Sequence, residues 1–294
     1  MDTLLMILLF VVISLLAATK ATTQSFGAKR YTVNTADSLL FMGLFFCVTA
    51  LTFLPSLIAS PPPAPVLLYA VAAAILNLTF QVSYTLALAR GPVSLTTLFS
   101  ALAILIPILG SVILFDEKMG WLRIVGLILT VLTFLLNAEK KKGERSADRT
   151  WPFLIALTLL ANGFASLLQK WFARGPYGTE IAGYGFFSYA LGAIIAFAAV
   201  LLLSRREKNR PTMRLKSPAV GWAAAVGLAL GIFQWLYTYA LRVYDATLLL
   251  PIYSGLSSLF LLCSGVIFFK ERPSRRRLAG MAVGLTAVVL FGIS

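Results

Sequence analysis

The amino-acid sequence predicts an all-α polytopic membrane protein with ten transmembrane helices, arranged as a 5+5 inverted-topology repeat. Composition, the spacing of apolar segments and an internal repeat lead to this fold class. Of the 294 residues, 59% are hydrophobic and only 12% are charged, whereas a soluble domain carries roughly 25% charged residues. So few charges could not cover the water-facing surface of a globule of this size. Most of the surface is therefore expected to face lipid.

Ten apolar segments each come close to the roughly 20 residues that a helix needs to cross a bilayer. Proline and glycine interrupt the pattern between several of them, as at Gly91-Pro92. No connection is long enough to form a separate soluble domain. The predicted crossings are residues 3–25, 36–59, 65–89, 93–115, 120–137, 152–173, 180–203, 218–242, 246–269 and 276–293.

The basic residues are unequally divided between the two sides of the predicted bundle. Odd-numbered connections hold 19 of the 25 lysines and arginines, and even-numbered connections hold four: Lys118, Arg123, Arg174 and Arg242. Because cytoplasmic loops are enriched in Lys and Arg, the odd-numbered connections are predicted to be cytoplasmic and both termini outside. The expected location is a prokaryotic cell (inner) membrane, crossed many times.

The charge and composition also exclude several functions. A net charge of +14 favours nucleic-acid binding in a soluble chain, but here the charge lies in short membrane connections, so no nucleic-acid partner is expected. The two cysteines lie in apolar segments and the chain has no histidine. We therefore expect no metal site and no cofactor.

Two stretches of the first half recur in the second half. Residues 80–89, FQVSYTLALA, resemble residues 233–242, FQWLYTYALR, and residues 111–126 resemble residues 265–280. Polar and apolar positions match in order at nearly one spacing, which favours an internal duplication. The predicted parts are a first five-helix repeat at 1–138, a basic cytoplasmic linker at 139–150 and a second repeat at 151–294.

An odd number of crossings per repeat makes the second repeat enter the membrane from the opposite face. Inverted-topology repeats are typical of secondary transporters, in which the two halves surround a central cavity. Such a cavity can open to either side of the membrane when the halves exchange conformations. Some inverted-repeat proteins are channels.

The chain resembles the EamA-type members of the drug/metabolite transporter superfamily. The resemblance rests on the 5+5 repeat, on Lys20 and Lys170 late in the first and sixth predicted helices, and on two junctions with Phe, Glu and Gly at matched spacing. These junctions are Phe115-Glu117-Gly126 and Phe269-Glu271-Gly280. The resemblance implies a ten-helix bundle with a central substrate cavity and alternating access. The uncharged SPPPAP after the second helix and the absence of a glutamate from the first helix depart from common patterns in the superfamily.

The third and eighth predicted helices carry the best candidates for substrate contacts. Asn77, Gln81 and Tyr84 are spaced to lie on one helical face, and Gln234 and Tyr237 repeat the pair in the second half. A polar stripe on a membrane helix faces protein or water. It either binds the solute or joins neighbouring helices by hydrogen bonds.

Further candidates are less specific. Trp235 and Tyr253 either line an amphipathic cavity or belong to the interfacial aromatic belt, and Ser254 allows either close helix packing or an exposed backbone. Lys20 and Lys170 either attract an anionic group or extend to the membrane interface; Asp37 and Glu180 are possible partners for them. Glu117 and Glu271 are interpreted as local helix caps and ion pairs.

The predicted function is transport of a small organic metabolite, such as an amino acid, an organic anion or a drug-like solute. The expected partners are the lipid bilayer and this solute, with the protein a monomer or homodimer. A lipid flippase and a non-transporting scaffold are the alternatives. A lipid-modifying enzyme is disfavoured, because the chain lacks histidine and paired carboxylates on one helical face.

Overall fold

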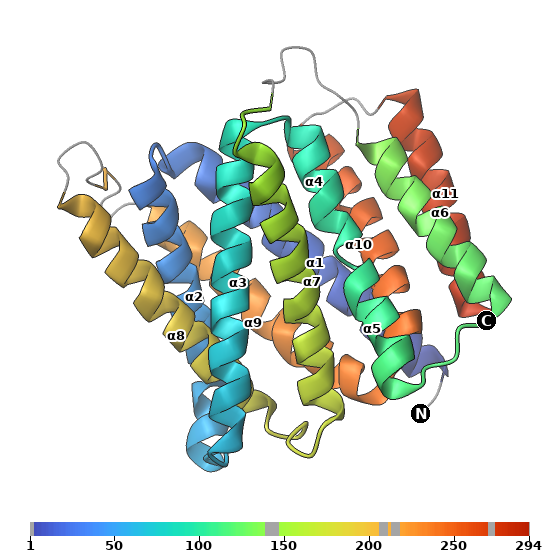
Figure 1. Cartoon of the computed structure of the whole chain (residues 1–294), viewed down its shortest axis with the longest axis horizontal. Helices are drawn as coiled ribbons and strands as arrows, with labels where there is room; N and C mark the ends of the chain where they lie inside the picture. Colours follow the sequence, from blue (N-terminus) through green and yellow to red (C-terminus); the bar gives the residue numbers. More distant parts are fainter. Residues whose placement is uncertain (1–2, 139–146, 206–210, 213–217, 270–273, 294) are drawn as a thin grey trace. The chain divides into compact units, whose positions relative to one another are not determined.

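The structure is a computed structural model that describes residues 3–138, 147–205, 211–212, 218–269 and 274–293. These residues form α-helices and no strand (Figure 1). The helices are α1 (Thr3–Tyr31), α2 (Thr35–Ala59), α3 (Pro65–Arg90), α4 (Val93–Leu102), α5 (Leu105–Phe115), α6 (Trp121–Asn137), α7 (Trp151–Arg174), α8 (Ile181–Ser204), α9 (Pro218–Val243), α10 (Ala246–Phe269) and α11 (Arg275–Gly292).

The predicted membrane character is confirmed within the described residues. Eight segments there are long and apolar enough to cross a membrane, and one of them, Leu95–Phe115, covers both α4 and α5. The shorter apolar helix α6 and the 18-residue α11 complete the ten predicted segments. The chain is therefore an all-helical, multi-pass integral membrane protein.

The fourth predicted segment differs from the structure, because it is broken between α4 and α5. The prediction was one helix over residues 93–115, but Ala103 and Ile104 lie outside both helices. Pro107 has no backbone N–H, so it cannot donate to the carbonyl of Ala103 four residues earlier. The amide of Ile106 donates to that carbonyl instead, at 3.2 Å.

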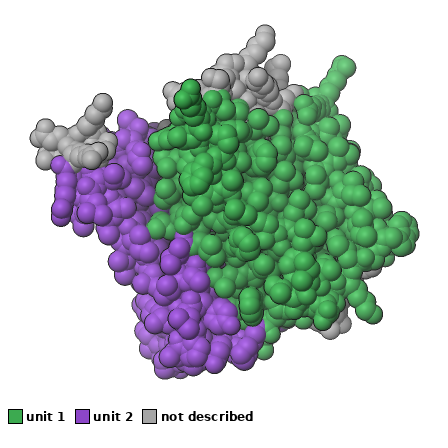
Figure 2. Space-filling view, viewed as in Figure 1, with its two compact units in different colours: residues 1–14, 76–174, 240–294 green, residues 15–75, 175–239 purple. Residues whose placement is uncertain are grey.

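The chain divides into two compact units, each built from separate stretches of sequence (Figure 2). Unit 1 comprises Met1–Ser14, Leu76–Arg174 and Ala240–Ser294, and unit 2 comprises Leu15–Ile75 and Gly175–Tyr239. Each unit thus takes residues from both halves of the sequence.

Glycines bring helices together inside each unit. In unit 2, a Cβ on Gly185 of α8 would lie 2.5 Å from the ring of Phe53 of α2. In unit 1, a Cβ on Gly126 of α6 would lie 2.7 Å from the ring of Phe291 of α11. Such contacts leave no room for a larger side chain, and close approach through small residues is the usual way in which membrane helices pack.

Candidate functional site

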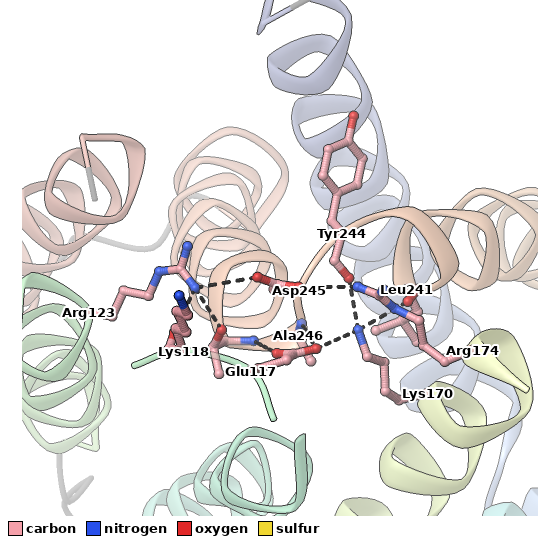
Figure 3. Close-up of polar contacts among 10 residues, drawn as sticks. Glu117, Lys118, Arg123, Lys170, Arg174, Leu241, Tyr244, Asp245 and Ala246 are labelled. Carbon is pink, nitrogen blue, oxygen red and sulfur yellow. Dashed lines mark hydrogen bonds and ion pairs between the residues drawn. The ribbon is translucent and has the colours of Figure 1, made fainter. Parts of the chain in front are cut away.

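A buried lysine lies at the centre of a cluster of polar contacts in unit 1 (Figure 3). Lys170 lies near the end of α7, and its side chain is 0% exposed. Its Nζ is 2.8 Å from Oε1 of Glu117 and donates hydrogen bonds to the carbonyl oxygens of Leu241 (3.1 Å) and Tyr244 (2.8 Å). An ammonium has three protons to donate, so all three find an acceptor here.

Glu117 lies between α5 and α6 and stabilises the start of another helix. Its carboxylate accepts hydrogen bonds from the backbone N–H of Ala246 at 3.0 Å and of Thr247 at 2.9 Å. These are the first residues of α10, whose amides have no acceptor within their own helix. A negative charge at a helix N-terminus is also favoured by the helix dipole. Glu117 is therefore a cap, but of a helix about 130 residues away along the chain and not of its own helix as the sequence had suggested.

The residue before Glu117 has a left-handed backbone conformation, which turns the chain at this point. Asp116, directly after α5, has φ 52° and ψ 32°, and its N–H donates to the carbonyl of Ser111. Aspartate is one of the few residues apart from glycine that adopt this conformation routinely. The chain turns at Asp116, and the side chain of Glu117 is buried.

The pKa of the Glu117 carboxyl reflects two opposing effects. Burial by itself raises this pKa, because it disfavours the charged form. The hydrogen bond from Lys170, the two backbone amides and the positive charge of Lys170 together outweigh burial and hold the pKa of Glu117 below its usual value. The carboxylate is thus charged at neutral pH, as its role as an acceptor requires.

A second layer of charges lies beside this buried pair. Asp245, between α9 and α10, accepts from Arg174 at 3.1 Å and lies 3.6 Å from Arg123. Arg123 also donates to the carbonyl of Lys118 and to the hydroxyl of Thr247.

These residues surround a recess of about 490 Å³ in unit 1. Its lining carries equal numbers of acidic and basic residues, so the recess has no excess charge to select an anion or a cation. The lining comprises Phe115, Asp116, Glu117, Lys118, Arg123, Arg174 and Asp245. We interpret the cluster as a structural network of ion pairs that connects the turn before α6, the end of α7 and the start of α10.

The polar residues of α3 lie in unit 1 together with Tyr253 and Ser254 of α10. Asn77, Gln81 and Tyr84 are half-buried, and the Tyr84 ring stacks on Phe80 with ring centres 5.7 Å apart. The hydroxyl of Ser254 donates to the carbonyl of Pro251 in its own helix at 3.1 Å. The carbonyl of Tyr253 accepts from Ser14 of α1.

The matching residues of α9 lie in unit 2 and make contacts between helices. The amide of Gln234 donates to the hydroxyl of Tyr189 of α8, a partner that the sequence did not indicate. Trp235 stacks on Phe53 of α2 with ring centres 5.5 Å apart. Tyr237 is buried and stacks on Phe233, one turn earlier in the same helix.

The two membrane lysines have different surroundings. Lys20 is half-buried and lies in α1, which continues to Tyr31 and not to residue 25 as predicted. Asp37, a suggested partner, accepts from the backbone amides of Val33 and Asn34 and from Thr212. It thus caps the start of α2 and joins it to a neighbouring segment. Glu180, the other suggested partner, is the residue directly before α8, and Glu271 lies outside the described residues.

Comparison with known proteins gives a family and a fold. Residues 149–293 match the EamA-like transporter family. One protein of known crystal structure has a TM-score of 0.74 and 17% sequence identity, over 96% of this chain and 94% of its own. At this level of identity the likeness establishes the fold alone. No curated protein sequence matches the chain significantly.

Proposed function

The chain belongs to the EamA-like transporter family through residues 149–293, and from this premise we propose that it is a secondary transporter. It moves a small organic metabolite, such as an amino acid, an organic anion or a drug-like solute, by alternating access through a central cavity. The family match is the observation that carries the proposal. Amides in membrane helices support it, because Asn77, Gln81 and Gln234 would be costly to bury against lipid.

The repeat and the orientation are parts of the same proposal. Residues 1–138 and 151–294 form two five-helix repeats inserted in opposite directions and joined by the basic linker 139–150. The odd-numbered connections face the cytoplasm and both termini face outside, in a prokaryotic inner membrane. The 19-to-4 division of lysine and arginine supports this orientation.

Flux measurements on the full chain in liposomes test the proposal. The expected result is that the protein equilibrates at least one solute from a panel of amino acids, organic anions and drug-like molecules. Gln81→Ala and Gln234→Ala are each expected to lower this flux about tenfold, because a lost hydrogen bond to a polar solute costs roughly 1–2 kcal/mol.

Thr85→Ala is the matched control. Thr85 is exposed and lies one turn from Gln81, where its hydroxyl donates to the carbonyl of Gln81. Its removal is expected to leave flux unchanged. Wild-type flux in both glutamine variants would rule out these side chains as substrate contacts, and no flux of any solute would rule out transport.

A further inference from the structure

We propose that the transported solute carries a carboxylate or phosphate group and that Lys20 binds it. This inference rests on the proposed function, since it assigns a chemical class to the solute. Two observations carry it: the depth of Lys20 in its helix, and its surroundings compared with those of Lys170.

Lys20 lies inside the apolar segment of α1 and not at its end. The apolar span of α1 runs from Leu4 to Ala28, so the nearer end of the span is eight residues, or about 12 Å, from Lys20. The predicted helix ended at residue 25, five residues after Lys20. The four-carbon stem of lysine covers only part of this depth.

The ammonium of Lys20 has no partner within the described part of the chain. No hydrogen bond or ion pair joins it to any residue there, although the side chain is half-buried. An isolated charge in the hydrocarbon region is costly, and such residues face the protein interior or a water-filled path. Lys170, by contrast, is fully enclosed by Glu117 and two carbonyl oxygens. Lys170 has a structural partner, whereas Lys20 is available to a ligand.

The neighbouring helix α9 carries a polar side chain, Gln234, at a height along the helix axes that is close to that of Lys20. Phe26 of α1 stacks on Trp222 of α9 with ring centres 5.6 Å apart, and α9 runs antiparallel to α1 (Figure 1). Counting along both helices from this contact puts Lys20 and Gln234 about 9 Å apart in height. This difference in height is within the length of a solute that carries an anionic group at one end and a hydrogen-bonding group at the other.

Thermal-shift measurements on the full chain in a neutral detergent test the inference. The probes are matched pairs that differ in one anionic group: glutamate and glutamine, aspartate and asparagine, glycerol 3-phosphate and glycerol. A ligand that binds the folded state raises its melting temperature. The anionic member of at least one pair is expected to raise it, and its neutral partner is not.

Variants of the lysine sharpen the test. Lys20→Met is expected to weaken binding of the anionic probe at least about tenfold, the usual loss with a hydrogen bond to a charged group. Lys20→Arg retains binding, and the exposed Lys118→Met, a control outside the membrane, matches the wild type. Without ligand, Lys20→Met is expected to melt no lower than the wild type, whereas Lys170→Met melts lower because it leaves Glu117 buried and unpaired.

Several results would overturn the inference. Two of them concern the wild type: neutral and anionic probes raise the melting temperature equally, or no anionic probe raises it. The other two concern Lys20→Met: it binds the anionic probe as the wild type does, or its melting temperature without ligand falls as far as that of Lys170→Met. A shift by added phosphatidylglycerol alone would identify a lipid headgroup as the ligand and overturn the soluble anion.

Flux measurements in liposomes separate this inference from the proposed function. If a neutral solute crosses as fast through Lys20→Met as through the wild type, transport stands and the anion site is wrong. If an anionic probe binds through Lys20 but never crosses, the site stands and transport of that solute is wrong.

Discussion

At the scale of single residues, Lys170 and Glu117 form a buried ion pair whose members also bind backbone groups of α9 and α10 and of the turn between them. The side chains are 0% and 3% exposed and lie 2.8 Å apart. Removing one partner of a buried pair costs about 3–5 kcal/mol, because the other charge stays buried without compensation. Glu117 also holds two amides of α10, so its loss affects more than the ion pair.

Glu117→Gln is therefore expected to destabilise the protein by about 3 kcal/mol. The measurement is the denaturation midpoint in detergent. Lys118→Gln, a change in the adjacent exposed lysine, is the control and should leave the midpoint unchanged. The double variant Glu117→Gln/Lys170→Met should be destabilised by less than the sum of the two single changes, since it leaves no unpaired charge. Strict additivity would contradict a direct interaction between the two side chains.

The pKa of Glu117 predicts how stability depends on pH. Its pKa is lower in the folded protein than in the unfolded chain, so the unfolded chain binds more protons between the two values. The stabilisation is complete above about pH 4.3, the ordinary value for glutamate, and is lost as the pH falls through the depressed value. The melting temperature of the wild type should therefore fall more steeply than that of Glu117→Gln on acidification below about pH 4.3. Parallel curves would contradict this prediction.

At the scale of elements, Pro107 separates α4 from α5. Other prolines do not have this effect, since α2 continues through Pro55 and α10 through Pro251. The break thus depends on context as well as on proline. Ile106 lies against Gly163 of α7, where an added Cβ would be 2.4 Å from the isoleucine side chain. This packing also fixes the direction of α5.

Pro107→Ala is expected to restore the missing donor to the carbonyl of Ala103. Hydrogen exchange of the amides at 104–106 should slow roughly fivefold, the effect of one hydrogen bond of about 1 kcal/mol. The control is Pro55→Ala, in a helix that is already continuous, which should leave exchange at 104–106 as in the wild type. Unchanged exchange in Pro107→Ala would show that the packing of Ile106 alone imposes the break.

The glycine pairs of α9 and α11 pack inside their own units. An added Cβ on Gly227 or Gly231 of α9 would meet side chains of α2, and one on Gly280 or Gly284 of α11 would meet side chains of α6. These spacings are a common signature of close helix packing. In each case the neighbour is another helix of the same chain.

At the scale of the whole molecule, the charge distribution predicts which side of the membrane each connection faces. Gly120 directly precedes α6, and Asp148 lies in the connection from α6 to α7. Both are exposed, and a side chain at Gly120 would meet no atom within 4 Å. They are suitable positions for single cysteines in a background with Cys47→Ser and Cys263→Ser.

A membrane-impermeant maleimide should label the Gly120→Cys variant in intact cells. It should label Asp148→Cys only after the membrane is made permeable, because the basic connections are predicted to face the cytoplasm. The opposite pattern would place both termini inside. Labelling of both variants in intact cells would contradict a crossing by α6.

The sequence by itself determined the features that depend on local composition. It predicted the membrane helices, their approximate limits and the family, because the hydropathy of a segment decides whether it can cross a bilayer. It also identified Lys20 and Lys170 as the unusual charges. It could not distinguish them, since both lie late in a comparable apolar segment.

Only the tertiary structure decided that Lys20 and Lys170 have different surroundings. Lys170 pairs with a carboxylate 53 positions away, on a turn that also caps the start of α10. These three segments meet only when unit 1 is folded, and no local pattern encodes that meeting. Lys20 has no such partner within the described residues, because no carboxylate is brought to it there. The physical reason is that a buried charge is stabilised by partner groups that reach it only when the chain folds. The ability of a segment to form a membrane helix depends on the hydropathy of its own residues.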